Sequence, residues 1–374
     1  MDSRMLVIST VARDLVMQGP AAWQIAREQG LRLTFAAAQD GWSERLTALG
    51  TFVPLPAPPS LGPAALVRLG RALARLGEAE DWDLVQVQAP VAAAVWRLVA
   101  PERLRRRTLY VAHGFPFQDG DRSLASAASR TVERFLAPRS LAVATVSRED
   151  HAWFSALPPH RRPAIVWSLP GAGVDVHRFR DAPRRAHAGV PYVLFCGDLD
   201  ANTDPLLAVE TVERAHVSLP GLRLVVIGEG PLRGRLEELA RARPWLTLID
   251  RADTMPAWVA GAGAVLAPSR REGMAETVVQ ALAAGTPVLA RANRGSRELL
   301  GDGAGMILPA SAGAARWAAA LEALLRQPPD PALMLDRAMA YDLTAFRPAY
   351  AGLLATCLEA TSRGSGQTEA LSAT

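Results

Sequence analysis

Short apolar runs alternate with helical patterns along most of the chain, and this alternation limits the possible folds more than any other feature. In the first half the runs predict strands at 5–10, 31–38, 83–88, 108–113, 141–147 and 164–170. A second series follows at 192–197, 222–230, 246–250, 264–269, 287–291 and 305–309. Strands separated by helices are typical of parallel sheets with crossover helices, so the sequence predicts an α/β fold.

A segment without regular periodicity separates the two series. Its sequence, FRDAPRRAHAGVP at 179–191, is rich in proline, arginine and alanine. A chain of 374 residues is long enough for two domains with full cores. We therefore predict two Rossmann-like, doubly wound domains that face a cleft, with ligands at the carboxyl ends of the strands. The predicted parts are two domains, a helix that can pack back on the first domain, and a disordered tail: 1–185, 186–343, 344–360 and 361–374.

Composition indicates a cytoplasmic protein. No apolar run reaches the roughly 18 residues that a membrane span needs. The start, MDSRMLVIST, enters a strand-like run without the features of a signal peptide. The two cysteines, Cys196 and Cys357, are too few for a disulfide framework, which favours a reducing compartment.

The basic residues have an unusual composition. All 41 are arginine, so a cationic contact to phosphate must come from a guanidinium group, with backbone N–H groups as the other donors. The arginines are scattered and form no basic stripe interleaved with aromatic residues. This pattern argues against nucleic acid as a partner.

The stretch SRREGMAETVVQALAAGTPVLA, 269–290, presents the start of a helix. The helix is predicted over 275–284 and ends at Gly285. Its first-turn amides, at 274–277, lack intrahelical partners and carry the positive end of the helix dipole, which predicts a site for a diphosphate. Glu272 would repel phosphate. It either faces a neutral, hydroxyl-rich group such as a sugar or only complements the helix dipole.

Five spaced motifs resemble the retaining glycosyltransferases of GT-B fold, family 4 (glycosyl transferases group 1), and within them the capsular and O-antigen polysaccharide subgroup. They span roughly residues 80–310. The motifs are YVAHGFPFQDG (110–120), LAVATVSREDHAWF (141–154), LPGAGVDVHRF (169–179), VVIGEGPLRGRLEELA (225–240) and PSRREGMAETVVQALAAGTPVLARANRGSRELL (268–300).

The resemblance implies roles for individual residues. Glu272 would accept hydrogen bonds from donor-sugar hydroxyls, and His113 would reach the same sugar from the first domain; these two are the catalytic candidates. The alternative for His113 is a histidine with satisfied hydrogen bonds at a strand end. The implied donor-binding residues lie around the sugar and diphosphate, at the ribose, under the nucleotide and near the base: Gly273, Met274, Ala275, Gln280, Gly228, Glu229, Gly230, Pro231, Arg251, Arg270, Arg271, Gly197, Asp198 and Thr203.

Three positions depart from the family pattern. Asp198 and Thr203 stand where the family usually has an arginine and a lysine that clamp the diphosphate, and Gln280 replaces a glutamate that holds the ribose. The arginines that could substitute for the clamp are Arg270, Arg271, Arg233 and Arg294. Asp198 and Asp200 have Asp-x-Asp spacing but fall on the phosphate loop, so we predict no metal site and no cofactor.

The implied function is transfer of a hexose, with retention and without a metal, from a UDP-sugar to a lipid-linked or saccharide acceptor in surface polysaccharide biosynthesis. The departures leave a second function open, a degenerate, non-catalytic GT-B protein that binds a sugar nucleotide or a partner transferase. An epimerase or a hydrolase on the same fold is a third.

The segment AALVRLGRALARLG, 64–77, bears on membrane contact. Arg68, Arg71 and Arg75 lie on one face of the predicted helix, and leucines lie largely opposite. Such a helix either docks peripherally on anionic lipid at the inner face of the cell membrane or only packs its leucines on the sheet.

Overall fold

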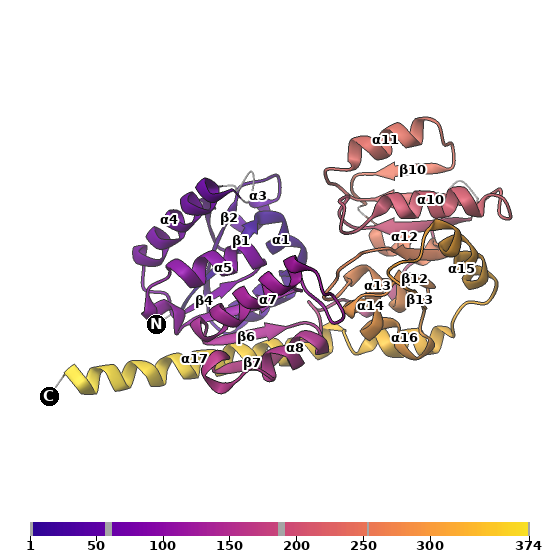
Figure 1. Ribbon diagram of the computed structural model, residues 1–374. Helices are drawn as coiled ribbons and strands as arrows, with labels where there is room; N and C mark the ends of the chain where they lie inside the picture. Colours follow the sequence, from indigo (N-terminus) through magenta and orange to yellow (C-terminus); the bar gives the residue numbers. More distant parts are fainter. Residues whose placement is uncertain (1–2, 57–61, 186–190, 253, 373–374) are drawn as a thin grey trace. The chain divides into compact units, whose positions relative to one another are not determined.

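The computed structural model describes residues 3–56, 62–185, 191–252 and 254–372. The chain divides into two compact units (Figure 1), Met1–Gly173 with Phe346–Thr374, and Val174–Ala345. Val174 begins the second unit because it pairs with Asp342 in an isolated β-bridge. The structure therefore ends the first unit earlier than the predicted division between residues 185 and 186.

The first unit is built on a seven-stranded parallel sheet with the order β3-β2-β1-β4-β5-β6-β7. The strands are β1 (Arg4–Val11), β2 (Arg32–Ala38), β3 (Thr51–Leu55), β4 (Leu84–Val87), β5 (Thr108–Ala112), β6 (Ala142–Thr145) and β7 (Ile165–Ser168). The helices are α1 (Ala12–Gln18), α2 (Pro20–Glu28), α3 (Ser43–Thr47), α4 (Pro63–Ala79), α5 (Pro90–Val99), α6 (Glu102–Arg105), α7 (Leu124–Leu136), α8 (Arg148–Ser155) and α17 (Leu343–Ser372), with short 3-10 turns η1 (Ala137–Arg139) and η2 (Pro159–Arg161).

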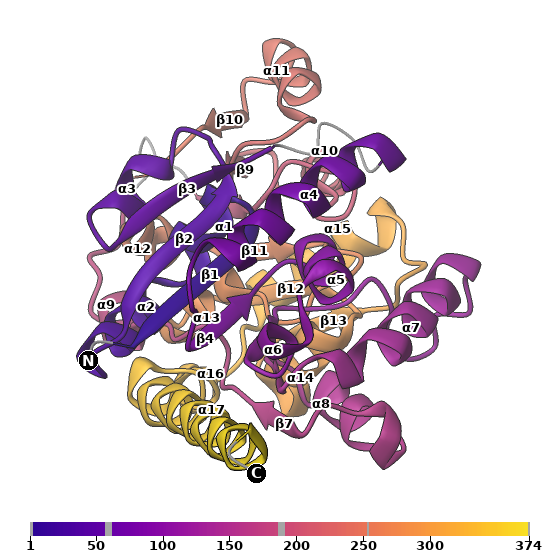
Figure 2. The ribbon, with the colours of Figure 1, turned by 90° about the vertical axis from the view of Figure 1, so that its left-hand side faces the viewer.

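The side chains of alternate β4 residues point to opposite faces of this sheet. Val85 and Val87 belong to the apolar core that also contains residues of α4 and α5. Gln86 points to the opposite face, where its Oε1 accepts a hydrogen bond of 2.7 Å from the Tyr350 hydroxyl of α17. Figure 2 shows α4 and α5 on one face of this sheet and α2 and α17 on the other.

The second unit has a six-stranded parallel sheet, and each of its strands falls on a predicted run. Its order is β10-β9-β8-β11-β12-β13. The strands are β8 (Tyr192–Cys196), β9 (Arg223–Ile227), β10 (Leu246–Ile249), β11 (Ala264–Ala267), β12 (Val288–Arg291) and β13 (Met306–Leu308). The helices are α9 (Val176–Arg180), α10 (Pro205–Ala215), α11 (Arg233–Arg241), α12 (Met255–Gly261), α13 (Glu276–Ala283), α14 (Arg294–Leu300), α15 (Ala314–Arg326) and α16 (Pro331–Met339), with the 3-10 turn η3 (Gly301–Gly303).

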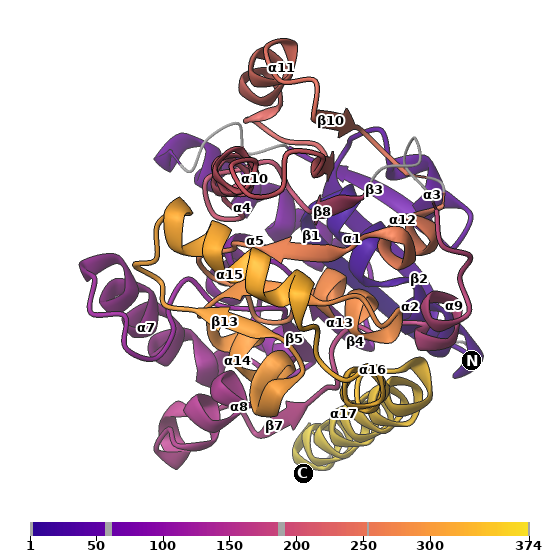
Figure 3. The same cartoon turned by 90° about the vertical axis from the view of Figure 1, so that its right-hand side faces the viewer.

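Helices cover both faces of the second sheet (Figure 3). Buried residues of α10, α11 and α15 form one apolar core with the sheet, and those of α9, α12, α13, α14 and α16 form the other. Both units are therefore doubly wound α/β structures with parallel sheets, as the alternation predicts. No helix in the described part of the chain is long and apolar enough to cross a membrane.

The last helix, α17, is longer than predicted. The predicted helix over 344–360 and the adjoining predicted disordered tail form one helix as far as Ser372, and the last two residues lie outside the described part. No proline follows Pro348 to interrupt the backbone hydrogen bonds. Gln29, after α2, donates from Nε2 to the carbonyl oxygen of Ala351 at 3.0 Å, so α17 packs within the first unit.

Candidate functional site

Three loops meet at the carboxyl edge of the second sheet, following β8, β9 and β11: 197–204, 228–232 and 268–275. The amide of Leu199 donates to the carbonyl of Glu229 at 2.9 Å, and the amide of Leu232 donates to the carbonyl of Leu199 at 2.8 Å. In the third loop, the amide of Arg270 donates to the carbonyl of Asn202 at 2.8 Å. Backbone hydrogen bonds thus join all three loops.

The structure places the predicted donor residues in these loops and next to them. They are Gly197, Asp198 and Thr203 after β8; Gly228, Glu229, Gly230 and Pro231 after β9; Arg251 after β10; Arg270, Arg271, Glu272, Gly273, Met274 and Ala275 after β11; and Gln280 within α13. His113 follows β5 in the first unit.

The glycines after β9 are required by the contact between loops. A Cβ atom on Gly228 would lie 1.9 Å from the carbonyl oxygen of Gly197. One on Gly230 would lie 2.6 Å from the carbonyl oxygen of Leu199. Any larger residue would separate the two loops. Their predicted place under a nucleotide stays a prediction.

Several polar groups of the loop after β8 form hydrogen bonds within the loop. Asp200 Oδ1 accepts hydrogen bonds from the backbone amides of Asn202 and Thr203, both at 2.9 Å. The Thr203 hydroxyl contacts the carbonyl oxygen of Asp198 and lies 3.1 Å from Asp200 Oδ1. This hydroxyl stands where the family has its phosphate-binding lysine, and its hydrogen bonds stay within the loop.

Asp204 holds two arginines beside this loop. Its Oδ2 accepts hydrogen bonds from Arg270 Nη2 at 2.9 Å and from Arg291 Nη2 at 2.6 Å. Arg291 is almost fully buried and also donates to the carbonyl oxygen of Pro268 at 2.7 Å. The guanidinium group of Arg270, a predicted substitute for the phosphate clamp, is therefore paired with a carboxylate in the structure.

Two further arginines bridge loops at this edge. Arg233 Nη2 lies 2.6 Å from Asp250 Oδ1, and Arg233 Nε lies 2.9 Å from Glu237 Oε1. The ion pair with Asp250 connects the start of α11 to the end of β10. Arg251 Nη2 lies 3.8 Å from Glu229 Oε1. Among the arginines at this edge, Arg233 was a predicted substitute for the clamp and Arg251 a predicted neighbour of the base.

Glu272 lies just before α13 in acidic surroundings. Burial, then repulsion by Asp198, raises the pKa of its carboxyl group to about 7, while Arg294 acts in the opposite direction. The amide of Gly295 donates to the carbonyl oxygen of Glu272 at 3.2 Å, which fixes the backbone of this loop against α14. At neutral pH the side chain can both donate and accept hydrogen bonds, since it is partly protonated.

Glu276, the first residue of α13, was missed by the sequence analysis. It is partly buried, and burial raises the pKa of its carboxyl group to about 7. Gln280 lies one turn later on the same face of α13. A glutamate in a first helical turn is an ordinary helix signal, so only its burial distinguishes it. The N-cap residue of α13 is Ala275, and no side chain of the described residues makes a capping hydrogen bond there.

Other chemistry at this edge is limited. Cys196 ends β8 near Thr277 of α13, and burial raises the pKa of its thiol to about 12, so the thiol is neutral. Within the described ranges, no group of three or more histidine, cysteine, aspartate or glutamate side chains is placed to hold a metal ion. The arrangement suits binding of a ligand by backbone amides and a partly protonated carboxyl group.

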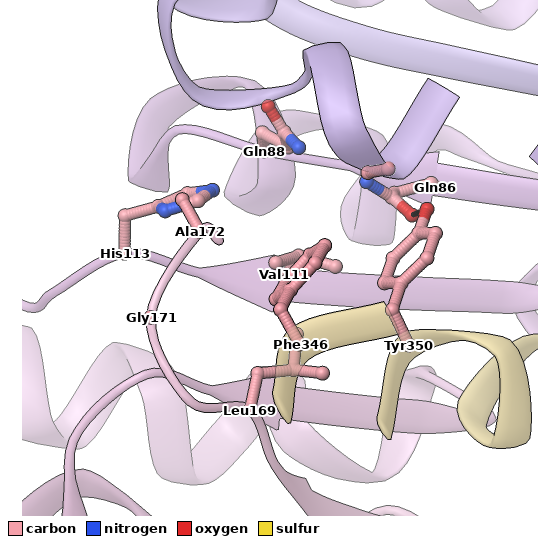
Figure 4. A pocket seen from close by; sticks show the side chains of 10 residues that line it. Gln86, Gln88, Val111, His113, Leu169, Gly171, Ala172, Phe346 and Tyr350 are labelled. Carbon is pink, nitrogen blue, oxygen red and sulfur yellow. Dashed lines mark hydrogen bonds between the residues drawn. The ribbon is translucent and has the colours of Figure 1, made fainter. Parts of the chain in front are cut away.

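The alternative interpretation of His113 is a histidine whose hydrogen bonds are satisfied within the protein, and the described residues do not satisfy its Nε2 atom. Its Nε2 atom is buried and has no hydrogen-bond partner in the described part of the chain. Burial lowers the pKa of the imidazole to about 4, so the ring is neutral at physiological pH. The side chain lines a pocket of the first unit (Figure 4), where it is available to a ligand.

Each unit matches a glycosyltransferase family model. Residues 19–169 match the glycosyl transferase 4-like domain, and residues 190–327 match glycosyl transferases group 1. The putative glycosyltransferase EpsD of Bacillus subtilis is 27% identical over 273 residues, which cover 69% of this chain and 71% of that protein. The D-inositol 3-phosphate glycosyltransferase of Mycolicibacterium paratuberculosis is 34% identical over 205 residues, which cover 50% of this chain and 45% of that protein.

Solved structures share the fold over nearly the whole chain. Anabaena Alr3699/HepE in complex with UDP and glucose has a TM-score of 0.69 at 15% identity, covering 95% of this chain and 100% of that one. An alpha,alpha-trehalose-phosphate synthase (UDP-forming) from Burkholderia vietnamiensis has a TM-score of 0.71 at 16% identity, covering 96% and 100%. With two family models that together cover both units, the chain belongs to the glycosyltransferases of GT-B fold.

Proposed function

We propose that the chain transfers a hexose, with retention, from a UDP-sugar to a lipid-linked or saccharide acceptor in surface polysaccharide biosynthesis. It would be a metal-independent enzyme of family 4, in the capsular and O-antigen polysaccharide subgroup, without a cofactor. The observation that carries the proposal is the position of Glu272, which lies in the third of the three joined loops, shortly before the start of α13. The solved relatives named above, one complexed with UDP and glucose and one UDP-forming, support the donor class.

The proposed chemistry rests on positioning and electrostatics. The first-turn amides of α13 hold the departing diphosphate, since the helix dipole favours an anion there. Glu272 accepts a hydrogen bond from a hydroxyl of the donor sugar, and its protonated form can donate one. One preorganised contact to developing charge can lower the barrier by about 3 kcal/mol. No side-chain nucleophile is assigned, and the leaving phosphate takes the proton of the acceptor.

The ion pairs at the carboxyl edge of the second sheet favour a second candidate function. This candidate is a degenerate GT-B protein that binds a sugar nucleotide or a partner transferase and does not transfer a sugar. Arg270 is paired with Asp204, and Arg233 is paired with Asp250. Asp198 and Glu276 add negative charge near Glu272. These pairings must rearrange before either guanidinium group can neutralise a diphosphate.

Calorimetric titration of the purified chain with UDP, GDP and ADP, with and without magnesium, tests the proposal. Tight binding of UDP alone, equal in both conditions, is the expected result, and release of UDP from a UDP-sugar in the presence of acceptor confirms transfer. Nucleotide binding without any transfer supports the non-catalytic candidate. If no nucleotide binds, the donor site proposed here is wrong.

A place in the cytoplasm, peripheral to the inner face of the cell membrane, is part of the proposal. On α4, Arg68, Arg71 and Arg75 are exposed, and so is Val67, with 51% of its surface accessible. Leu69 and Leu73 are buried in the apolar core that includes the sheet, and α4 still presents a basic face with an apolar residue. Such a face suits anionic lipid next to a lipid-linked acceptor.

A further inference from the structure

A pocket opens at the carboxyl edge of the first sheet (Figure 4). Its walls come from α2, the ends of β4, β5 and β7, and α17. The lining residues are Ala22, Gln86, Gln88, Val111, His113, Leu169, Gly171, Ala172, Phe346 and Tyr350. It has room for about one water-sized group. Such a pocket can take a single functional group but not a sugar ring.

Three polar atoms of the lining lack hydrogen-bond partners among the residues that the structure describes. They are Gln86 Nε2, Gln88 Oε1 and His113 Nε2. Gln86 has no exposed surface and Gln88 has 2%, so both amides are withdrawn from bulk water. Leaving a buried polar group unsatisfied costs about 1–3 kcal/mol, and most such groups in proteins have a partner. Their occurrence together around one pocket indicates a polar occupant.

The Tyr350 hydroxyl determines how Gln86 faces the pocket. It donates to Gln86 Oε1 at 2.7 Å, which leaves the Nε2 side of the amide for another partner. Tyr350 itself is held by α17, where its ring stacks on Phe346 with a centroid separation of 5.5 Å. The last helix of the chain therefore acts as a wall of the pocket and positions one of its donors.

The chemistry of the lining residues favours an uncharged polar group as the occupant of the pocket. None of the ten residues carries a formal charge, since His113 is neutral at physiological pH. An anion such as phosphate or carboxylate would be desolvated there without a countercharge. A hydroxyl group donates one hydrogen bond and accepts two, which matches the acceptor atom of Gln88, the donor atom of Gln86 and either role of the imidazole.

We propose that this pocket is a subsite that takes one hydroxyl group of a sugar, bound by Gln86, Gln88 and His113, while the ring stays outside. The proposal rests on the proposed function, which supplies two sources for that sugar. The hydroxyl belongs either to the hexose of the nucleotide-sugar donor or to a saccharide acceptor. Gln88 is then a specificity-determining residue and Tyr350 a positioning residue.

Two measurements on Gln88→Leu test the proposal and separate the sources. Calorimetry compares UDP with UDP-glucose, UDP-galactose and UDP-N-acetylglucosamine, because the difference from UDP isolates contacts to the sugar. Saturation-transfer NMR with methyl α-glucopyranoside, methyl α-galactopyranoside and methyl α-mannopyranoside probes a free saccharide. Gln88→Met is a second variant of similar shape without the amide. Gln29→Leu is the control, since Gln29 contacts α17 outside the pocket.

If the source is the donor, Gln88→Leu raises the Kd of at least one UDP-sugar about tenfold, or about 1.4 kcal/mol, and leaves that of UDP unchanged. If the source is a saccharide acceptor, Gln88→Leu keeps the wild-type Kd values for the UDP-sugars and loses the saturation transfer to a methyl glycoside. Wild-type values in both measurements, with either variant folded, overturn the proposal and leave a structural water as the occupant. A wild-type chain that binds methyl glycosides but no nucleotide supports the subsite and refutes the proposed function, and one that binds no probe refutes both.

Discussion

Glu272 is the residue on which the proposed chemistry most depends. We expect Glu272→Ala to abolish transfer and to leave the Kd of UDP nearly unchanged, because the side chain is assigned to the sugar and the diphosphate to backbone amides. Release of UDP from a UDP-sugar measures transfer, and calorimetry measures the affinity. Glu238→Ala, at an exposed residue of α11, is the control. Wild-type turnover in Glu272→Ala would remove this residue from the mechanism.

A buried ion pair is the residue-scale feature that most affects stability. Arg97, with no exposed surface, makes two hydrogen bonds of 2.9 Å to Glu133, and its guanidinium group lies 4.5 Å from the ring centroid of Tyr110. Glu133→Gln leaves the buried arginine without its countercharge, so we expect a loss of about 3–5 kcal/mol in the free energy of unfolding, measured by urea titration.

Replacing both partners separates the charge effect from packing. The double variant Arg97→Met with Glu133→Leu should recover most of that loss, because neither charge is then buried. Glu102→Gln, which breaks an exposed ion pair with Arg106, should have little effect. A single variant no less stable than the wild type would show that water reaches Arg97.

At the residue scale, the sequence places side chains on loops but does not show how they pair. Glu272, Asp198 and Thr203 lie at one sheet edge as expected, because parallel strands end together there. Arg270 pairs with Asp204, a contact between two loops 66 residues apart that no local pattern signals. The importance of Glu276 was missed for the same reason, since its burial depends on the packing of α13.

At the level of elements, the two glutamates around the start of α13 predict that the stability of the folded protein depends on pH. The pKa values of Glu272 and Glu276 in the folded protein are about 7, above the usual glutamate value. At these two sites the folded state binds protons more tightly than the unfolded state. Their contribution to stability is therefore fully present below about pH 4.5 and is lost as the pH rises through about 7. Glu276→Gln should raise the Tm at about pH 8 and flatten the decline.

Thermal unfolding at a series of pH values measures this effect. Glu210→Gln, at an exposed residue of α10, is the matched control and should keep the wild-type slope. UDP should also bind more tightly at about pH 6 than at pH 8, since protonation removes negative charge beside the proposed diphosphate site. An unchanged slope in Glu276→Gln would mean that this carboxyl group is solvated.

The basic face of α4 makes a separate prediction. Changing Arg68, Arg71 and Arg75 together to glutamine should weaken sedimentation with vesicles of anionic phospholipid, most clearly at low salt, because exposed charges attract such a surface electrostatically. The control removes equal charge from exposed arginines of the second unit: Arg214, Arg235 and Arg241. Equal binding of both triple variants would leave α4 with a packing role only.

The elements themselves could largely be predicted, and the exceptions have physical causes. All six strands of the second sheet fall on predicted runs, because buried parallel strands are short and continuously apolar. β3 was missed because Pro54 and partly exposed residues weaken its pattern; an edge strand tolerates both. The polar residues after 360 predict disorder, whereas the helical hydrogen bonds of α17 continue to Ser372.

At the scale of the whole chain, the second unit is an insertion whose two ends pair with each other. The amide of Val174 donates to the carbonyl oxygen of Tyr341 at 3.2 Å, and the amide of Leu343 donates to the carbonyl oxygen of Val174 at 3.0 Å. The chain then returns to the first unit as α17. The sequence predicts this return as a possibility of the terminal helix, but the pairing that closes the second unit involves residues too far apart for local patterns.

This closure predicts that the two units respond differently to loss of α17. A chain that ends at Ala345 loses the apolar residues that α17 buries in the first unit, among them Tyr350, Leu353 and Leu354, and the partner of Gln86. We expect hydrogen exchange to show loss of protection in β4 and β5 and full protection in β8 and β11, whose core contains no residue after Ala345. A chain that ends at Arg363 keeps these contacts and should behave as the wild type. Equal loss of protection in both sheets would show that the second unit does not fold independently of α17.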